Sequence, residues 1–458
     1  LTANLVRDRS DSRSYNPANQ PGDTFDKRTS YSEVEPLQDL DGRSGSLRVK
    51  YALGEHLSLK SITAVGGFNL DPVSYDNDGQ SALIQKNLIH YNDRYVTQEV
   101  QLNGDFGALT FTGGLFYLHE RFFVERDGFT RQGTSPTAAV SGLRAHNITT
   151  TDAYAIFGEA TYRLGSVFSL TGGLRGTIEH KGFVFDNKVI NFVRIVTAQS
   201  IAGQADETWR ALTPKASVQA QWNPTLLQYA SYSQGFKSGG YDNRATRLDL
   251  ATLPFAPEKV STYETGLKAT LFDRTLRSNI AVFYNDYQDL QVSFFDPVYQ
   301  GSRRGNAGKA HSWGIEIENS ASLTDRLNVQ LAGGYLHATF DDYKGAGGAG
   351  VDADGNRLTN APKWTVTGGA SYDLPLAAAG SLRLAADANY QSSYYVSALN
   401  RPQDRSPGQV YVNSTITWKT PNPQIDVTMS VRNVLNGSKQ VASVYNPSIG
   451  AWYQNFPD

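Results

Sequence analysis

Apolar residues occupy every second position in many segments of the chain. Between positions 260 and 272, for example, Tyr263, Leu267 and Leu271 alternate with Glu264 and Lys268. Successive side chains of a β-strand point to opposite faces, so a period of two predicts a strand with one apolar and one polar face. One face can meet lipid and the other can meet water.

The same period predicts about 17 strands, each long enough to cross the hydrocarbon layer, which takes about 9 to 11 residues of a tilted strand. The predicted strands cover residues 1–10, 43–53, 57–70, 94–104, 108–122, 151–164, 166–178, 207–221, 226–235, 260–272, 275–292, 309–322, 326–340, 363–374, 381–392, 408–419 and 424–435. Most strands of soluble proteins are shorter, at about 5 or 6 residues.

Short and long connections alternate between these strands. Turn-forming residues make the short connections, at 54–56, 105–107, 223–224, 273–274, 324–325 and 421–423, and the longest connections are 71–93, 123–150, 236–257 and 341–361. Antiparallel neighbours place all short turns on one rim and all long loops on the other. The pattern therefore predicts an all-β membrane protein, a large antiparallel up-and-down transmembrane β-barrel with long extracellular loops and short periplasmic turns.

Composition agrees with this fold and excludes several partners. Hydrophobic residues make up 40% of the chain, yet no run of about 18 apolar residues could form a spanning helix. The 25 tyrosines and 21 phenylalanines suit interfacial girdles, although a tyrosine-rich soluble β-protein is the alternative. A net charge of -2 provides no basic field for nucleic acid, and the absence of cysteine excludes disulfides and thiolate sites.

Catalytic and metal-binding motifs are absent from the sequence. The seven histidines lack ligand spacing, and neither a G-x-S-x-G elbow nor a phosphate-binding loop occurs. The segments 76–79 and 352–355 resemble half of a calcium loop without its downstream glutamate, which favours acidic loop tips. The sequence therefore predicts no enzyme activity, no metal site and no cofactor.

Several strings resemble, in order, those of the TonB-dependent receptors, in particular of their C-terminal transport barrel. They are Phe255-Ala-Pro-Glu-Lys-Val-Ser-Thr-Tyr-Glu-Thr-Gly-Leu-Lys268, Ala281-Val-Phe-Tyr-Asn-Asp-Tyr287, Asp289-Leu-Gln-Val292, Asn306-Ala-Gly-Lys-Ala310, Gly314-Ile-Glu-Ile-Glu318, Asn360-Ala-Pro-Lys-Trp364 and Val431-Arg-Asn-Val-Leu435. One such string is weak evidence, but their shared order along the whole chain makes the resemblance strong.

The resemblance also implies what a complete receptor contains. Family members begin with a signal peptide, an energy-coupling box and a plug domain, followed by a barrel of about 22 strands. We therefore expect residues 1–458 to be a single barrel fragment with about 17 of those strands, lacking the signal peptide, the plug, the first strands and the last strand. Residues 443–458 resemble the last external loop of the family.

The function implied by the resemblance is active import across the outer membrane of a Gram-negative bacterium. The expected substrate is an iron–siderophore complex, and the expected partners are outer-membrane lipid and the TonB–ExbB–ExbD complex, reached through the missing plug. An oligosaccharide or an aromatic compound is the alternative substrate. A passive porin or a structural outer-membrane protein is the alternative from another class.

Four charged residues are expected to face the lumen. They are Glu264, Lys268, Glu316 and Glu318. A solvated wall is one interpretation, and contact with a plug is the other. Gly266, between the first two, is expected to be a point of close approach or of strand bending.

The long loops combine arginines with aromatic residues, and they are the expected ligand site. Guanidinium groups pair with carboxylate, catecholate or phosphate oxygens, and aromatic faces stack on planar ligands or sugars. The candidates are Tyr241, Arg244, Arg247, Tyr299, Arg303, Arg304, Tyr394, Tyr395, Tyr445 and Trp452. The alternative is that they are rim arginines and girdle tyrosines.

Overall fold

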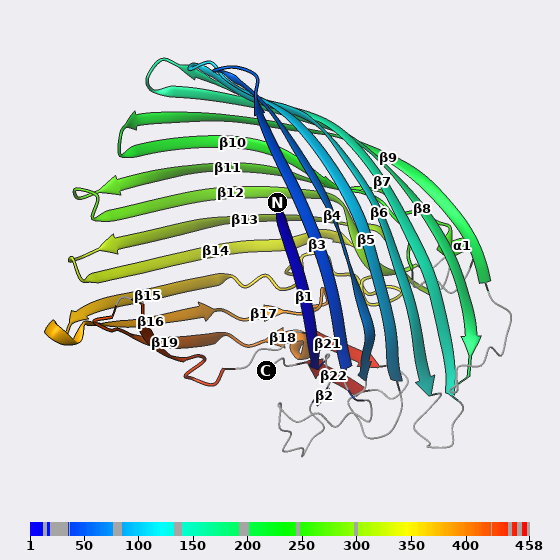
Figure 1. The fold of residues 1–458 in the computed structure, drawn as a ribbon. Coiled ribbons are helices and arrows are strands. Elements are labelled where there is room, and N and C mark those ends of the chain that lie inside the picture. Colours follow the sequence, from blue (N-terminus) through cyan, green and yellow to red (C-terminus); the bar gives the residue numbers. More distant parts are fainter. Residues whose placement is uncertain are drawn as a thin grey trace.

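Strands form most of the described structure, which is a computed structural model. The described residues are 1–11, 16–18, 35, 37–76, 85–131, 140–191, 201–243, 248–296, 301–422, 424–437, 442–446 and 451–455. Within them, 17 strands form one sheet. Figure 1 shows this sheet curling, with β3 to β9 on the right and β10 to β16 and β19 on the left.

The strands of the large sheet are β1 (Thr2–Asp11), β3 (Leu37–Ala52), β4 (Leu57–Asp76), β5 (Gln85–Asp105), β6 (Leu109–Arg131), β7 (Val140–Leu164), β8 (Phe168–Ile190), β9 (Ile201–Asn223), β10 (Leu226–Lys237), β11 (Glu258–Leu271), β12 (Leu276–Asp296), β13 (Gly301–Ser322), β14 (Leu327–Tyr343), β15 (Trp364–Pro375), β16 (Ser381–Gln391), β19 (Gln409–Lys419) and β20 (Asp426–Val431). The smaller elements are β2 (Asn16–Ala18), β17 (Tyr394–Tyr395), β18 (Arg405–Ser406), β21 (Ala442–Asn446), β22 (Ala451–Asn455), the helix α1 (Leu248–Ala251), and the 3-10 turns η1 (Ala377–Ala379) and η2 (Pro402–Asp404). Across the described ranges, no helix is long and apolar enough to cross a membrane.

Each strand of the large sheet pairs antiparallel with the next strand of that sheet along the chain. The registers run from β1–β3 through β9–β10 to β19–β20. Among the described residues, β1 pairs in register with β3, and β20 pairs in register with β19. This confirms the predicted up-and-down order, and each of the 17 predicted strands corresponds to one strand of the sheet.

One face of the sheet carries exposed apolar side chains, and we call it the outward face. On neighbouring strands, Leu115 lies opposite Ile156, and Gly176 of the next strand lies opposite both Ile156 and Leu212. Ile156 is 65% exposed and Leu212 is 61% exposed. Exposed side chains of this size on one face are stable against lipid, which confirms the predicted alternation.

Aromatic side chains border the apolar band of the outward face. Near the short turns, Phe168 lies 5.8 Å from Trp222 between ring centroids. Toward the long loops, Tyr263 lies 5.0 Å from Tyr232, and Tyr335 lies 4.8 Å from Trp364. Aromatic rings at both levels match the girdles that sit at the two membrane interfaces.

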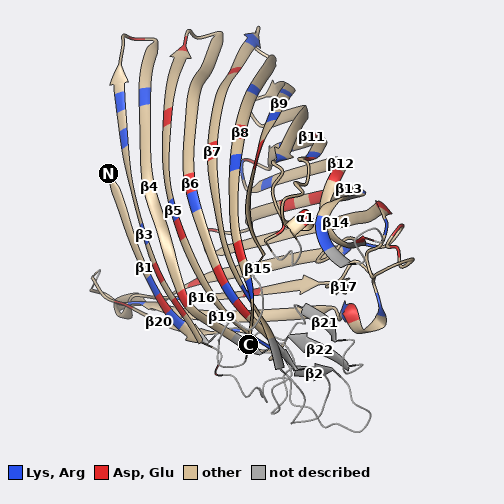
Figure 2. Ribbon diagram, turned by 90° about the vertical axis from the view of Figure 1, so that its right-hand side faces the viewer, with Lys and Arg blue, Asp and Glu red and all other residues tan. Residues whose placement is uncertain are grey.

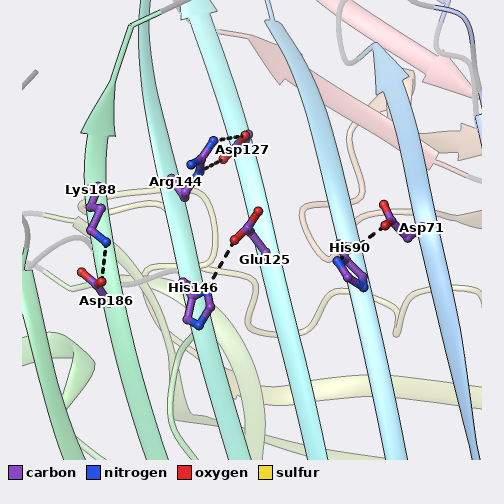
Figure 3. A network of polar contacts seen from close by, with 8 residues as sticks. All are labelled: Asp71, His90, Glu125, Asp127, Arg144, His146, Asp186 and Lys188. Carbon is purple, nitrogen blue, oxygen red and sulfur yellow. Dashed lines mark hydrogen bonds and ion pairs between the residues drawn. The ribbon is translucent and has the colours of Figure 1, made fainter. Parts of the chain in front are cut away.

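Beyond the second girdle, the two faces exchange their character. On β8, the inward-facing Phe183 and Phe185 are buried, whereas the outward Asp186 pairs with Lys188 at 2.6 Å. On β6 and β7, the outward Glu125 lies 3.3 Å from His146. Figure 3 draws this pair. Figure 2 shows charged positions crowding the lower ends of β1 to β8. This exchange marks the end of the lipid-facing band.

The exchange explains where the predicted strand ends were wrong. The predicted long connection 123–150 contains the end of β6, at Arg131, and the beginning of β7, at Val140. Apolar and polar residues still alternate there, but with the opposite phase, because the outward side chains now meet water. The strands therefore extend well past the membrane on the long-loop side.

Candidate functional site

The inward face of β10 and β11 presents an organised polar patch. The Tyr229 hydroxyl donates a hydrogen bond of 2.7 Å to Glu264, and the Lys268 ammonium lies 5.7 Å from the centre of the Tyr229 ring. Tyr229 is in register with Gly266, where an added Cβ would lie 2.6 Å from the tyrosine ring. The missing side chain at Gly266 lets the ring lie against the wall, which confirms the predicted close approach.

Glu316 and Glu318 lie on the same inward face, on β13. Ala281 is in register with both Gly266 and Glu316, so these residues form one row across three strands. Both glutamates are exposed and border a hollow of about 190 Å³ with Thr365 and Thr367. Neither carboxylate forms an ion pair within the described ranges. Contact of these residues with a plug stays a prediction.

Between β10 and β11, the chain folds back against the inward wall. We call its described residues, 238–243 and 248–257, the strap. Tyr241 stacks on Phe183 with ring centres 5.3 Å apart and planes 6° apart. Phe183, Phe185, Leu250 and Ala251 form the buried cluster beneath it. The aromatic cluster therefore fixes one side of the mouth.

Polar contacts hold the base of the strap. The Lys181 ammonium donates to the Ser238 hydroxyl at 2.7 Å and to the Gly239 carbonyl at 3.1 Å. Gln291, on β12, donates from its side-chain amide to the Ser238 carbonyl at 2.8 Å. Because these partners belong to β8 and β12, the strap bridges strands that are not neighbours in the sheet.

The surroundings of Tyr241 also change its acidity. Burial, followed by the nearby carboxylates of Glu207 and Asp206, raises the pKa of the Tyr241 hydroxyl to about 12. The phenol therefore stays protonated at neutral pH, and its ring packs inside the strap cluster. Its predicted role in ligand binding stays a prediction.

Arg303 and Arg304 differ in their surroundings. The Arg303 guanidinium lies 2.7 Å from Asp296 and 4.8 Å above the ring of Phe294, so its charge is already matched. Arg304 donates its backbone N–H to Asp242 at 2.8 Å, which joins this hairpin to the strap. Its exposed side chain has no partner among the described residues. Of these two arginines, Arg304 is therefore the one whose charge is available to a ligand.

Tyr394 and Tyr395 lie in a second group of packed loops. Tyr394 is 5% exposed, and the Arg357 guanidinium lies 5.7 Å from the centre of the Tyr395 ring. Arg357 also donates to the Ala361 carbonyl at 2.6 Å, and burial lowers the pKa of its guanidinium. The sequence interpretation missed Arg357, because only the folded loops show which residues it contacts.

The acidic segment 352–355 has a cationic partner. The Lys344 ammonium lies 3.4 Å from Asp352 and also contacts Asp354. The hydrogen bond from Lys344, together with the one from the backbone N–H of Tyr343, holds the pKa of Asp354 below its ordinary value. Within the described ranges, no group of three or more His, Cys, Asp or Glu residues could hold a metal ion.

The remaining rim candidates have partial descriptions. Arg244, Arg247 and Tyr299 lie outside the described residues. Tyr445 and Trp452 occupy opposite positions in the register of β21 and β22. Their participation in ligand binding stays a prediction.

Comparison with known proteins identifies related receptors. A metal-pseudopaline receptor (CntO) of Pseudomonas aeruginosa is 29% identical over 174 residues, which cover 38% of this chain and 22% of that protein. A pesticin receptor of Yersinia enterocolitica is 23% identical over 315 residues, covering 66% of this chain and 43% of the relative. The chain thus spans less than half the length of these relatives.

Solved structures share the fold. The ferric yersiniabactin uptake receptor FyuA of Yersinia pestis superposes with a TM-score of 0.77 at 18% identity, covering 93% of this chain and 60% of that one. The siderophore receptor PiuA of Acinetobacter baumannii gives 0.77 at 16% identity, covering 99% and 70%. The family model described as TonB dependent receptor-like, beta-barrel, matches residues 2–434. The chain therefore belongs to the TonB-dependent receptor family, and its match lies in the β-barrel of that family.

Proposed function

We propose that this chain forms the wall and mouth of a receptor that imports an iron–siderophore complex. The observation that carries the proposal is the exposed, unmatched Arg304 at a rim held in place by the strap. The guanidinium can pair with the anionic oxygens of a ferric chelate. Receptors for metal-pseudopaline and for ferric-pyoverdine among the relatives support this substrate class.

The family supplies the general setting. TonB-dependent receptors are transport receptors of the outer membrane of Gram-negative bacteria, they work with TonB, and they are not enzymes. In our proposal, a plug domain couples to the TonB–ExbB–ExbD complex and rests against the inward wall. Glu264, Lys268, Glu316 and Glu318 are the wall residues that would contact it.

A carbohydrate or an aromatic compound is the alternative substrate. Such ligands bind by stacking on open aromatic faces. At this rim, the ring of Tyr241 packs on Phe183, and Tyr394 is buried. Packed rings offer little stacking surface, which favours the anionic chelate over the alternative.

Substituting Arg304 by alanine is expected to weaken binding of the ferric chelate by about tenfold or more, because a charge-assisted hydrogen bond contributes about 1.5–3 kcal/mol. The measurement is equilibrium binding of ferric citrate, a ferric catecholate and a ferric hydroxamate to the purified protein. Lys309→Ala is the matched control, since Lys309 is an exposed cation on the outward side of the same strand.

Three results test the substrate class and the role of Arg304. Binding of at least one ferric chelate, weakened by R304A and unchanged by K309A, supports the proposal. Binding of maltohexaose or of an aromatic acid, with none of the ferric chelates bound, would favour the alternative. Equal chelate affinity of wild type and R304A would remove Arg304 from the ligand site.

A further inference from the structure

Three arginines share one row of the outward face, and we call them the arginine row. They are Arg43 on β3, Arg94 on β5 and Arg121 on β6, all with exposed side chains. Arg43 and Arg94 are both in register with Gly67 of β4, and Arg94 lies directly opposite Arg121. Neighbouring strands are about 4.8 Å apart, so the three guanidinium groups can reach a common ligand.

The arginine row is not neutralised by the protein. In the described part of the chain, none of its three side chains forms an ion pair or a hydrogen bond. The outward carboxylates nearby have other partners: Asp41 lies 3.9 Å from Arg7, and Asp152 lies 2.8 Å from His119. Farther from the membrane, Glu125 and Asp127 pair with His146 and Arg144 (Figure 3).

Such an arrangement carries an energetic cost unless an anion relieves it. Like charges directly opposite each other on neighbouring strands destabilise a sheet. Arg94 and Arg121 occupy that geometry and face away from the lumen, so neither an imported ligand nor a plug can reach them. Their charge is therefore available to a partner outside the sheet.

A hollow lies beside the row. It has a volume of about 720 Å³, and Arg43 and Arg94 border it, with Gly67 between them. Because Gly67 has no side chain, the floor between the two arginines stays open. Val65 and Asn92 also line it, so the hollow offers both apolar and polar contacts.

The hollow sits at the edge of the lipid-facing band. Val65 and Val96 lie one row closer to the short turns, opposite each other, and Leu47 and Val49 continue the exposed apolar surface on β3. Beyond the row, the outward face becomes charged. Acyl chains can therefore lie along the valines and the leucine while a headgroup lies at the arginines. This is the level of anionic headgroups, which attract basic residues.

We propose that the arginine row binds a phosphate group of a phosphorylated outer-leaflet lipid. The phosphate lies between Arg43, Arg94 and Arg121, as guanidinium groups bind phosphate through paired N–H donors. The lipid surrounds the protein on its outward side, so the site operates independently of ligand capture at the mouth. It fixes the depth of β3 to β6 in the membrane.

The test measures binding of lipid A by the full chain, purified in a neutral detergent, with native mass spectrometry. Replacing Arg94 and Arg121 together by glutamine is expected to weaken lipid A binding by about 25-fold, or about fivefold for each arginine. Arg210→Gln is the matched control, because Arg210 is an exposed outward arginine on β9, away from the row. Arg43→Gln tests the row from a third strand.

Comparison ligands separate the phosphate from the rest of the lipid. Dephosphorylated lipid A should bind wild-type protein as weakly as lipid A binds the double variant, a comparison that needs no mutation. Inorganic phosphate alone should neither bind measurably nor displace lipid A. Equal binding of dephosphorylated lipid A, displacement by inorganic phosphate, or full lipid A binding by R94Q/R121Q would each overturn the proposal. The expected lipid A results do not depend on chelate binding at the mouth, so a failure of the proposed function would leave them unchanged.

Discussion

Replacing Phe183 by alanine is expected to release the strap and to cost about 3–5 kcal/mol of the free energy of unfolding. Phe183 is 2% exposed, and its ring lies 5.3 Å from Tyr241 and 5.5 Å from Phe185. Alanine would leave a cavity beneath Tyr241 that the rigid strands β8 and β9 cannot close. The strap would then lose this stacking contact and keep its polar contacts, among them those with Lys181, Gln291 and Arg304.

Hydrogen exchange of the strap, together with thermal unfolding in detergent, measures this effect. F183A should accelerate amide exchange at 238–243 and 248–257 and lower the unfolding midpoint. Val184→Ala is the control, because Val184 is the exposed outward neighbour of Phe183 and supports no strap contact. Unchanged strap exchange in F183A, or the same acceleration in V184A, would show that the aromatic cluster does not hold the mouth.

The second large effect is expected from an arginine on the lipid-facing side of β13. Ile317 is 40% exposed and lies opposite Ile280, in the middle of the apolar band. A charged side chain at the bilayer midplane of a barrel costs about 2–4 kcal/mol. Ile317→Arg should therefore destabilise the protein in a bilayer by this amount.

The next residue provides the control. Glu318 is exposed on the inward face, where water can solvate an arginine, so Glu318→Arg should change stability by less than about 0.5 kcal/mol. Reversible unfolding by urea or guanidinium from phospholipid vesicles gives both values. Equal costs at the two adjacent positions would contradict the assignment of the faces.

The fold was largely predictable, because a period of two survives in each membrane-crossing segment. The predicted strand 260–272 corresponds to Glu258–Leu271, and 381–392 to Ser381–Gln391. The errors lie at the long-loop rim, where the phase of the alternation is reversed. There, Phe183 faces inward and Glu125 faces outward. A search for strands with apolar residues on the outward face therefore ends each strand too early.

The candidate site was predictable only in part. Strand alternation was enough to place Glu264 and Lys268 on one face, and Gly266 marked the close approach. Its partner Tyr229 was not predictable by counting residues, because the long strap connection lies between β10 and β11 and hides their register. Which rim arginine is matched was not predictable, because the Asp296–Arg303 pair and the Asp242–Arg304 contact depend on how the loops fold.

Single-cysteine labelling along β13 tests the two-faced sheet most directly. The chain contains no cysteine, so variants at 316, 317 and 318 each carry one thiol. In lipid vesicles, a water-soluble maleimide should label the cysteines at 316 and 318 and spare the one at 317. A lipid-borne quencher should quench a fluorescent probe at 317 but not one at 316 or 318. Equal labelling at all three positions, or labelling at 317 only, would contradict a sheet with lipid on one face and water on the other.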